Sequence, residues 1–282
     1  MKPIEFSNQS IASILPKRPE RSNKATFGKV LCVAGSYCMS GAAYLCGKAA
    51  YRTGVGLVKI LTPEENRIIL QASLPEALLS VYDGDSPSES DIENAVKWAD
   101  VIAVGPGLSR SNGAKAVLST VLRNAARPLV IDADALNIIS EDPRLWSLVP
   151  KGSVITPHPG EMSRICGCPI DEILANVNDI CIGFANAHGI ICVLKDHTTA
   201  VSDGKELYVN DTGNSGMATA GSGDVLAGII AALMAQGMTP FAAAILGVRI
   251  HGLAGDHSAL LLGEYSMMAS DIIESIPHVI KQ

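Results

Sequence analysis

A glycine-rich stretch that ends in an aspartate carries the residue types that point most directly to chemistry. The stretch 213–224 is GNSGMATAGSGD, and an apolar run predicts a helix from about Val225. The first backbone N–H groups of a helix have no partner within it and carry partial positive charge. Gly221 and Gly223 let the chain approach a phosphate closely at that point. The pattern therefore predicts a phosphate-binding site with Asp224 at its mouth.

Asp224 itself has two interpretations. A carboxylate beside a bound phosphate is electrostatically unfavourable, so its presence suggests a specific task. The task that fits is to orient and deprotonate a hydroxyl group that attacks a phosphoryl group. In the alternative interpretation, Asp224 only caps the helix and the glycines only form a turn. The stretch alone leaves both open.

The two commonest nucleotide-binding motifs are absent from the sequence. No stretch matches G-x-x-x-x-G-K-[ST], and AGSYCMSGAA, which follows the first apolar run, lacks the G-x-G-x-x-G spacing. The sequence therefore excludes a P-loop nucleotide site and a Rossmann dinucleotide site of the ordinary kind.

Short apolar runs that alternate with helical patterns are expected to position the glycine-rich stretch. The runs are 29–35, 56–63, 100–107, 127–135, 152–160 and 189–196. The helical patterns are 41–53, 111–125, 171–187, 221–237 and 240–262. Continuous apolar runs are typical of strands buried on both faces, as in a mostly parallel sheet covered by helices. We therefore predict an α/β fold whose ligand crevice lies at the carboxyl ends of the strands.

Composition and charge narrow the function classes. The chain has 282 residues, of which 48% are hydrophobic and 18% are charged, and its net charge is −6. These values exclude disordered and collagen-like classes. An acidic chain without a basic run lacks the charge that nonspecific nucleic-acid binding requires. No apolar stretch is long enough for a signal peptide or a membrane span, so we expect a cytoplasmic protein, without a membrane or nucleic-acid partner, that binds a small molecule.

The cysteines indicate reduced thiols rather than disulfides. There are seven, an odd number, and none form a C-x-x-C pair. Cys166 and Cys168 form a single C-x-C pair, which is a weak pattern for a structural metal site. The sequence identifies no metal ligands.

Five separated motifs, in consistent order, carry a resemblance to a known family. They are AGSYCMSGAAYLCGKAAYRTGVGLV, GPGL, DADALN, TPHPGEM and NSGMATAGSGDVLAG. The chain from about Lys29 to Gly263 resembles the ADP- or ATP-dependent NAD(P)H-hydrate dehydratases, a branch of the ribokinase-like superfamily. The resemblance implies a three-layer α/β/α ribokinase-like fold with a mostly parallel central sheet. We expect residues 1–282 to form this single domain, without the N-terminal epimerase domain of some relatives.

The resemblance also implies a reaction. Its substrate is hydrated NADH or NADPH, in which water has added across C5 and C6 of the reduced ring. ADP or ATP phosphorylates the C6 hydroxyl, and elimination of phosphate restores the cofactor. Phosphate leaves far more readily than hydroxide, so the transfer makes an otherwise difficult dehydration easy. Mg²⁺ is the expected companion of the nucleotide. The sequence distinguishes neither ADP from ATP nor one hydrate from the other.

The catalytic and nucleotide-binding positions follow from the resemblance, position by position. Asp224 is implied to be the catalytic base, and Gly221 and Gly223 to form the anion hole with Ser222. The implied nucleotide-binding residues are Lys195, Asp196, His197, Thr198, Thr199, Asn214, Ser222 and Gly223. Asp196 stands where the family pattern has glycine. We expect strain there if the position needs a positive φ, and weaker nucleotide binding from the added charge.

The implied substrate-binding residues are Ala42, Gly107 and His158, together with Asp224. Ala42 is small and lies at a predicted helix start, where a dinucleotide backbone can come close. Gly107 and His158 lie in loops that follow apolar runs. The alternative for His158 is a purely structural, hydrogen-bonded histidine at a strand end.

Three further carboxylates have two interpretations each. Glu161 either holds Mg²⁺ through water or is a favourable carboxylate in the first turn of a helix. Asp132 and Asp134 either shape the floor of the site or cap a helix through Asn137.

Two other functions remain open. A small-molecule kinase of the hydroxyethylthiazole or hydroxymethylpyrimidine type would share the glycine-rich stretch and the aspartate, but the loops GSYCMSGAA and GPGL favour a dinucleotide. A non-catalytic nucleotide-binding protein on the same fold would have no reason to keep a charge that faces phosphate.

The apolar segments 221–237 and 240–262 contain more nonpolar surface than one sheet face needs to cover, so we expect a homo-oligomer.

Overall fold

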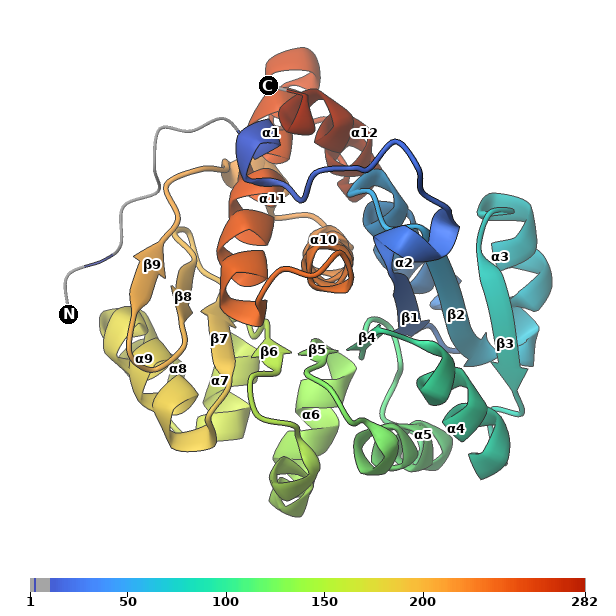
Figure 1. Ribbon diagram of the computed structural model, residues 1–282. Coiled ribbons are helices and arrows are strands. Elements are labelled where there is room, and N and C mark those ends of the chain that lie inside the picture. The colour runs from blue at the N-terminus through green and yellow to red at the C-terminus, as the bar shows by residue number, and fades with distance from the viewer. Residues whose placement is uncertain (1–2, 4–10, 282) are drawn as a thin grey trace.

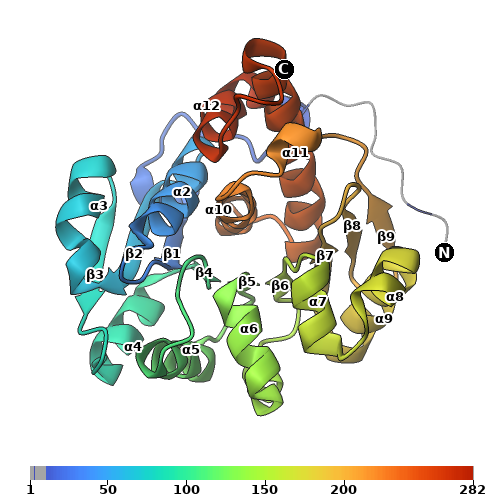
Figure 2. The same ribbon diagram turned by 180° about the vertical axis from the view of Figure 1, so that it is seen from behind.

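Nine strands form one sheet between two layers of helices in the computed structural model, which describes residue 3 and residues 11–281 (Figures 1 and 2). The strand order is β3-β2-β1-β4-β5-β6-β7-β8-β9. The strands are β1 Lys29–Val33, β2 Leu57–Pro63, β3 Leu78–Tyr82, β4 Val101–Val104, β5 Val130–Ile131, β6 Val154–Ile155, β7 Ile191–Leu194, β8 Ala200–Ser202 and β9 Leu207–Val209. Strands β1 to β7 pair in parallel, and β8 and β9 are antiparallel.

The helices divide between the two faces of the sheet (Figures 1 and 2). One face carries α1 Ile11–Ile14, α2 Ser40–Arg52, α3 Arg67–Ser73, α10 Ser222–Ala235, α11 Pro240–Leu262 and α12 Ala269–Ile280. The other face carries α4 Glu89–Trp98, α5 Asn112–Asn124, α6 Asp134–Glu141, α7 Pro159–Cys166, α8 Ile170–Ala175 and α9 Val177–His188. The three-layer α/β/α fold with a mostly parallel sheet is confirmed.

Alternate residues of one strand show why the apolar runs are continuous. Val30 and Cys32 of β1 belong to the core beneath α2 and α10, whereas Leu31 and Val33 belong to the core on the opposite face. All four are fully buried. Because side chains alternate across a strand and both faces are covered, every position must be apolar.

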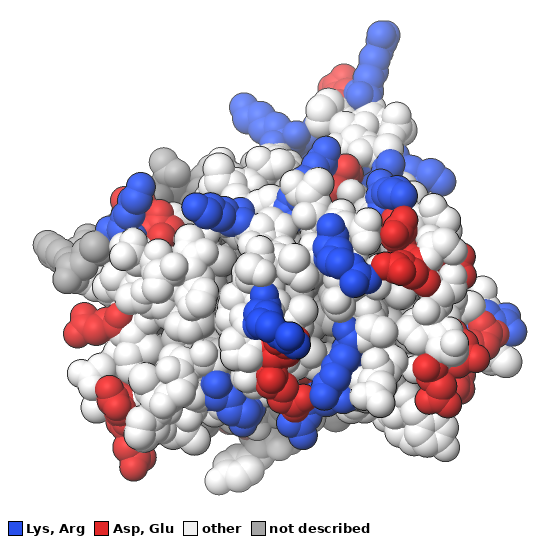
Figure 3. Space-filling model, turned by 90° about the horizontal axis from the view of Figure 1, so that it is seen from below, with Lys and Arg blue, Asp and Glu red and all other residues white. Residues whose placement is uncertain are grey.

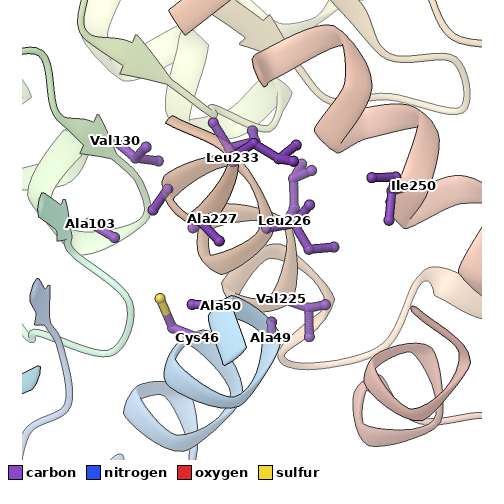
Figure 4. Close-up of a cluster of buried hydrophobic side chains, with 14 of the residues drawn as sticks. Cys46, Ala49, Ala50, Ala103, Val130, Val225, Leu226, Ala227, Leu233 and Ile250 are labelled. Atoms are coloured by element: carbon purple, nitrogen blue, oxygen red, sulfur yellow. The ribbon is translucent and has the colours of Figure 1, made fainter. Parts of the chain in front are cut away.

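Helix α10 is buried on nearly all sides (Figure 4). Its residues pack against α2, where Cys46, Ala49 and Ala50 face it, and against α11. A Cβ atom on Gly228 would lie 2.2 Å from the backbone oxygen of Cys46, so only glycine permits this close approach of the two helices. Contacts within the chain therefore account for the apolar character of α10. The homo-oligomer stays a prediction, supported only by the exposed residues Leu260 to Leu262 at the end of α11.

Several predicted elements differ from the structure. The helix predicted at 171–187 is two helices, α8 and α9, separated at Asn176. The helix predicted from about Val225 begins three residues earlier, at Ser222. The runs 127–135 and 152–160 contain strands of only two residues each, because polar loops of the crevice occupy the rest.

Within the described residues, no helix is long and apolar enough to cross a membrane. On the face formed by the helices that lie below the sheet in Figure 1, basic and acidic side chains are interspersed (Figure 3). That face presents no single-sign field of the kind that attracts nucleic acid.

Candidate active site

The start of α10 has the geometry of an anion site. Gly221 precedes the helix with φ 89°, a left-handed conformation that favours glycine. Its side chain, if it had one, would lie 2.3 Å from Leu45 Cδ1. Because Gly221 is the N-cap residue, Asp224 lies within the first turn and is not the cap. The purely structural interpretation of Asp224 as a capping residue is therefore wrong.

A cavity of about 840 Å³ opens at this helix start. Seven of the predicted nucleotide-binding residues line it: Lys195, Asp196, His197, Thr199, Asn214, Ser222 and Gly223. Thr198 does not line it, although both its neighbours do. His158 also faces the cavity, so a residue predicted for the substrate and residues predicted for the nucleotide border one space.

An ion pair stands beside the first turn of α10. The Nζ atom of Lys195 lies 3.1 Å from Oδ1 of Asp132, whose side chain is 2% exposed. A Cβ atom on Gly223 would lie 3.2 Å from that Nζ and 3.6 Å from Oδ2 of Asp132. The structure supports the interpretation that Asp132 shapes the floor of the site, since this carboxylate holds Lys195 next to the helix start.

Charge and burial act on Asp224 together. Burial and, after it, the nearby charge of Asp132 raise the pKa of Asp224 to about 7, although Lys195 opposes the increase. Burial also disfavours the charged form of Lys195, but the carboxylates of Asp132 and Glu161 outweigh it, so the pKa of Lys195 lies above its ordinary value. The site therefore holds one permanent cation beside a carboxylate that exchanges its proton near neutral pH, as a general base must.

His158 and Glu161 cap α7 reciprocally. His158 Nδ1 accepts hydrogen bonds from the backbone N–H groups of Gly160 (3.0 Å) and Glu161 (3.4 Å), and Glu161 Oε2 accepts from the backbone N–H of His158 at 2.9 Å. The structural interpretations of both residues are therefore seen in the structure. The side chain of His158 is also 51% exposed, and its Nε2 atom lies 3.4 Å from Oε1 of Glu161. Burial, followed by the charge of Lys195, lowers the pKa of His158, which favours its neutral form.

The loops after β1 and β4 meet at Ala42 and Gly107. A Cβ atom on Gly107, whose φ is 58°, would lie 2.7 Å from the Cβ atom of Ala42. Neither residue lines the 840 Å³ cavity, so they form a separate part of the crevice. In the same region, Asp134 Oδ2 accepts a hydrogen bond of 2.8 Å from the backbone N–H of Ser109. Asp134 thus orders the GPGL loop, and its Oδ1 also accepts a hydrogen bond of 3.4 Å from Nδ2 of Asn137, the residue that its second interpretation named.

Backbone strain gathers along the same edge of the sheet. Among the described residues, positive φ angles outside glycine occur at Cys38, Ser109 and Ala133. These residues follow β1, β4 and β5 respectively. Strained backbone of this kind concentrates at functional sites, where the surrounding structure holds it. The observation supports the crevice at the carboxyl ends of the strands.

Comparisons with known proteins agree with this geometry. A model of the family described as NAD(P)H-hydrate dehydratase matches residues 30–278. The chain belongs to the NAD(P)H-hydrate dehydratase family. The resemblance found from the motifs is thereby confirmed, and the match covers most of the chain.

Individual members of the family cover the chain to different extents. An ADP-dependent (S)-NAD(P)H-hydrate dehydratase of Neisseria meningitidis is 39% identical over 86% of this chain and 81% of its own length. A bifunctional NAD(P)H-hydrate repair enzyme of Moorella thermoacetica is 38% identical over 95% of this chain but 52% of its own length. The chain thus spans about half the length of the bifunctional relatives it matches.

A solved family structure shares the fold. The ADP/ATP-dependent NAD(P)H-hydrate dehydratase of Bacillus subtilis, co-crystallised with ATP and Mg²⁺, superimposes with a TM-score of 0.83 at 29% identity. The superposition covers 96% of this chain and 95% of that one.

The motifs of this dehydratase-family chain did not identify two residues that contact the predicted nucleotide-binding residues. His251 of α11 lies 3.2 Å from the hydroxyl of Ser222, and burial lowers its pKa to about 4, so it is neutral. Asp256, one turn further along, accepts hydrogen bonds from the Gly213 backbone and the Asn214 side chain, both at 3.0 Å. The available signal was the occurrence of polar residues inside an otherwise apolar helical pattern.

Asp196 does not have the positive φ that a glycine in the family pattern at this position suggested. It is not among the residues with positive φ, so the predicted strain does not arise. Its Oδ2 lies 3.0 Å from Nδ1 of the exposed His197, at the rim of the cavity. Only the added charge remains as a consequence of this substitution.

Proposed function

We propose that the chain dehydrates hydrated NADH or NADPH in a reaction driven by ADP or ATP. The observation that carries the proposal is that the first turn of α10, which contains Asp224, begins at a large cavity lined by Lys195, Ser222 and Gly223, although Asp224 itself does not line that cavity. In the first step the C6 hydroxyl loses its proton and its oxygen attacks the terminal phosphorus of the nucleotide, while the bond from that phosphorus to the bridging oxygen breaks. AMP leaves when ADP is the donor, and ADP leaves when ATP is the donor. In the second step the ring nitrogen supplies electrons as the C6–O bond breaks and phosphate departs, and the loss of a proton from C5 then restores the double bond between C5 and C6.

The cavity suggests how the nucleotide lies. Its phosphates would bind the backbone N–H groups at the start of α10 and the ammonium of Lys195, since both favour negative charge. The base would then extend between Met217, Leu226 and Val248, the apolar part of the lining. Ser222, held by His251, and Asn214, held by Asp256, would contact the phosphates.

The charge of Asp196 is expected to weaken nucleotide binding. Asp196→Asn and Asp196→Gly should therefore tighten ATP binding about two- to fivefold, the effect of one partly screened charge near a polyanion. Calorimetric titration with ATP measures the change, and the gain should shrink at high salt. Weaker binding by the Asn variant, which keeps the shape of the side chain, would show that Asp196 makes a useful contact instead.

Asp224 would act as the base in the first step. Its ionised form accepts the hydroxyl proton, and its raised pKa makes it a stronger base than an exposed aspartate. Lys195 and the N–H groups of the first turn would stabilise the charge on the transferring phosphoryl group. Asp132 would hold Lys195 in place throughout, because the buried pair keeps the ammonium next to Gly223.

The rate should depend on pH through Asp224. Since only the ionised carboxylate accepts a proton and its pKa is raised to about 7, kcat/KM should fall as pH decreases below 7. The decline should approach about tenfold per pH unit, as for a single group. Initial rates between pH 5.5 and 8.5 measure the profile. A flat profile over that range would contradict the assignment of Asp224 as the base.

The residues of the site are compatible with Mg²⁺ that binds together with the nucleotide. Within the part of the chain that the structure describes, no cluster of three or more His, Cys, Asp or Glu side chains is placed to hold a metal ion. Asp132 is already paired with Lys195, and Glu161 is used in the cap of α7. These observations fit an ion held chiefly by nucleotide phosphates and water, with Glu161 contacting it through water. When bound, it would neutralise charge on the phosphates.

The proposed function is tested by mixing the purified chain with Mg²⁺, each hydrate and either ADP or ATP. Recovery of the reduced-nicotinamide absorbance supports it. Phosphorylation of hydroxyethylthiazole or hydroxymethylpyrimidine without such recovery would favour the kinase alternative. Binding of ATP without either reaction would favour a non-catalytic nucleotide-binding protein.

Three further properties belong to the same proposal. The seven free cysteines and the reduced substrates fit the cytoplasm, where thiols stay reduced. The family match from residue 30 to residue 278 supports one catalytic domain over residues 1–282. A second copy of the chain would cover the exposed end of α11 in a homo-oligomer.

A further inference from the structure

Arg164 is an exposed cation whose direction is fixed by the fold. Its Nε donates a hydrogen bond of 2.9 Å to Oδ1 of Asn137 on the adjacent helix α6. Figure 2 shows α6 and α7 side by side below the sheet. Among the described residues, Arg164 makes no ion pair with a carboxylate. Its two terminal nitrogens therefore remain available to an anion, while the side chain is held at Nε.

The guanidinium reaches back toward the site. A Cβ atom on Gly160 would lie 3.8 Å from Nη1 of Arg164 and 2.9 Å from Cε1 of His158. The cation therefore lies beside His158, at the start of α7, although Arg164 itself is more than one turn further along. Side chains of a helix lean toward its N-terminus, which accounts for this reach. The positive charge of Arg164 contributes, after burial and Lys195, to the lowered pKa of His158.

Hydrogen bonds connect Arg164 to the other substrate loop as well. Asn137 Nδ2 lies 3.4 Å from Oδ1 of Asp134, and Asp134 Oδ2 accepts from the backbone N–H of Ser109. Ser109 lies two residues after Gly107. The series therefore joins the loop after β4 to the start of α7, the two places where Gly107 and His158 are expected to contact substrate. Arg164 lies at the end of that series.

The charge of the crevice explains why a cation is needed there. Asp132, Asp224 and Glu161 lie close enough to Lys195 for their charges to act on it, and Lys195 is paired with Asp132. A dinucleotide carries two negative charges on its pyrophosphate, and the NADPH form adds a 2′-phosphate. A negatively charged substrate would be repelled by these carboxylates without a compensating cation at the rim.

We propose that Arg164 binds a phosphoryl group of the hydrated dinucleotide, with Asn137 as the residue that positions it. The inference rests on the proposed function, because it assigns a contact to that substrate. A guanidinium held at Nε presents its two Nη donors to the oxygens of one phosphate, a geometry that a lysine ammonium does not reproduce.

The test compares Arg164→Gln and Arg164→Lys with the wild-type chain, using the hydrates of NADH and NADPH in turn. The Gln variant should raise the KM for hydrate roughly tenfold to a hundredfold, the loss of one charged hydrogen-bonding group, with kcat within about twofold. The Lys variant should recover only part of the loss. The KM for ATP should not change. Lys151→Gln removes an exposed cation before β6, at the opposite edge of the sheet, and serves as the matched control.

Each result has one meaning. A raised KM for the NADPH hydrate alone identifies the 2′-phosphate, and an equal rise for both hydrates identifies the pyrophosphate; either supports the proposal. Unchanged KM values in Arg164→Gln, or an equal rise in Lys151→Gln, would overturn it. Turnover of neither hydrate by the wild-type chain would refute the proposed function instead, so the two failures are distinguishable.

Discussion

Asp224→Asn is expected to lower kcat by a factor on the order of a hundred or more while the affinity for ATP stays within about threefold. Asparagine keeps the size and the hydrogen-bonding shape of the side chain but cannot accept the hydroxyl proton. Lys195, Ser222 and Gly223, which are proposed to contact the nucleotide, line the cavity, whereas Asp224 does not. Steady-state kinetics and calorimetric titration with ATP separate the two effects. Unchanged turnover would leave Asp224 without a catalytic role.

The same variant is expected to change how the stability of the folded chain depends on pH. Asp224 has a pKa of about 7 in the folded chain against an ordinary 3.8, so the folded state holds its proton more tightly than the unfolded state does. The wild-type chain therefore loses stability as pH rises from about 4 through 7, and the uncharged Asn variant lacks this loss. Asp224→Asn should raise Tm more at pH 8 than at pH 5. An equal change at both pH values would contradict the raised pKa.

Lys195→Met is expected to lower kcat by about 10²- to 10³-fold. The variant removes the cation next to the first turn of α10, where charge accumulates on the transferring phosphoryl group. It also leaves Asp132 buried without its partner, which should cost about 3–5 kcal/mol of unfolding free energy. Steady-state kinetics with both substrates near saturation and denaturant unfolding measure the two losses.

The double variant Lys195→Met with Asp132→Asn separates catalysis from stability. Removing both charges takes away the unpaired buried carboxylate, so much of the lost stability should return. The rate should not return, because the phosphoryl group still lacks its cation. Recovery of kcat to within about threefold of the wild-type value would show that Lys195 is only a structural counter-ion.

Local pattern predicted the elements that position the phosphates. The glycine-rich stretch and the apolar helix after it are encoded by contiguous residues, and α11 has the bounds that its pattern predicted, 240–262. Strands β5 and β6 are shorter than the runs that predicted them, because polar loops of the crevice occupy the rest of each run. The break at Asn176 carries neither glycine nor proline, and a single asparagine is a weaker sign of the division between α8 and α9.

The partners within the site depend on contacts that no local pattern contains. Lys195 meets Asp132 across 63 positions of sequence, and His251 meets Ser222 across 29. Parallel strands bring the ends of distant segments to one edge, so the edge was predictable but the pairings were not. The motif identified Asp224 as important, whereas its raised pKa follows from burial and from Asp132, both of which require the fold.

Phosphoryl transfer before dehydration is the central claim, and an oxygen label tests it most directly. Hydrate prepared in H₂¹⁸O carries ¹⁸O in its C6 hydroxyl, and the wild-type chain would convert it with Mg²⁺ and ATP in unlabelled water. Because the hydroxyl oxygen attacks phosphorus and the C6–O bond then breaks, the released phosphate should contain one ¹⁸O atom per cofactor restored. Unlabelled phosphate, with the ¹⁸O released into water, would contradict the account.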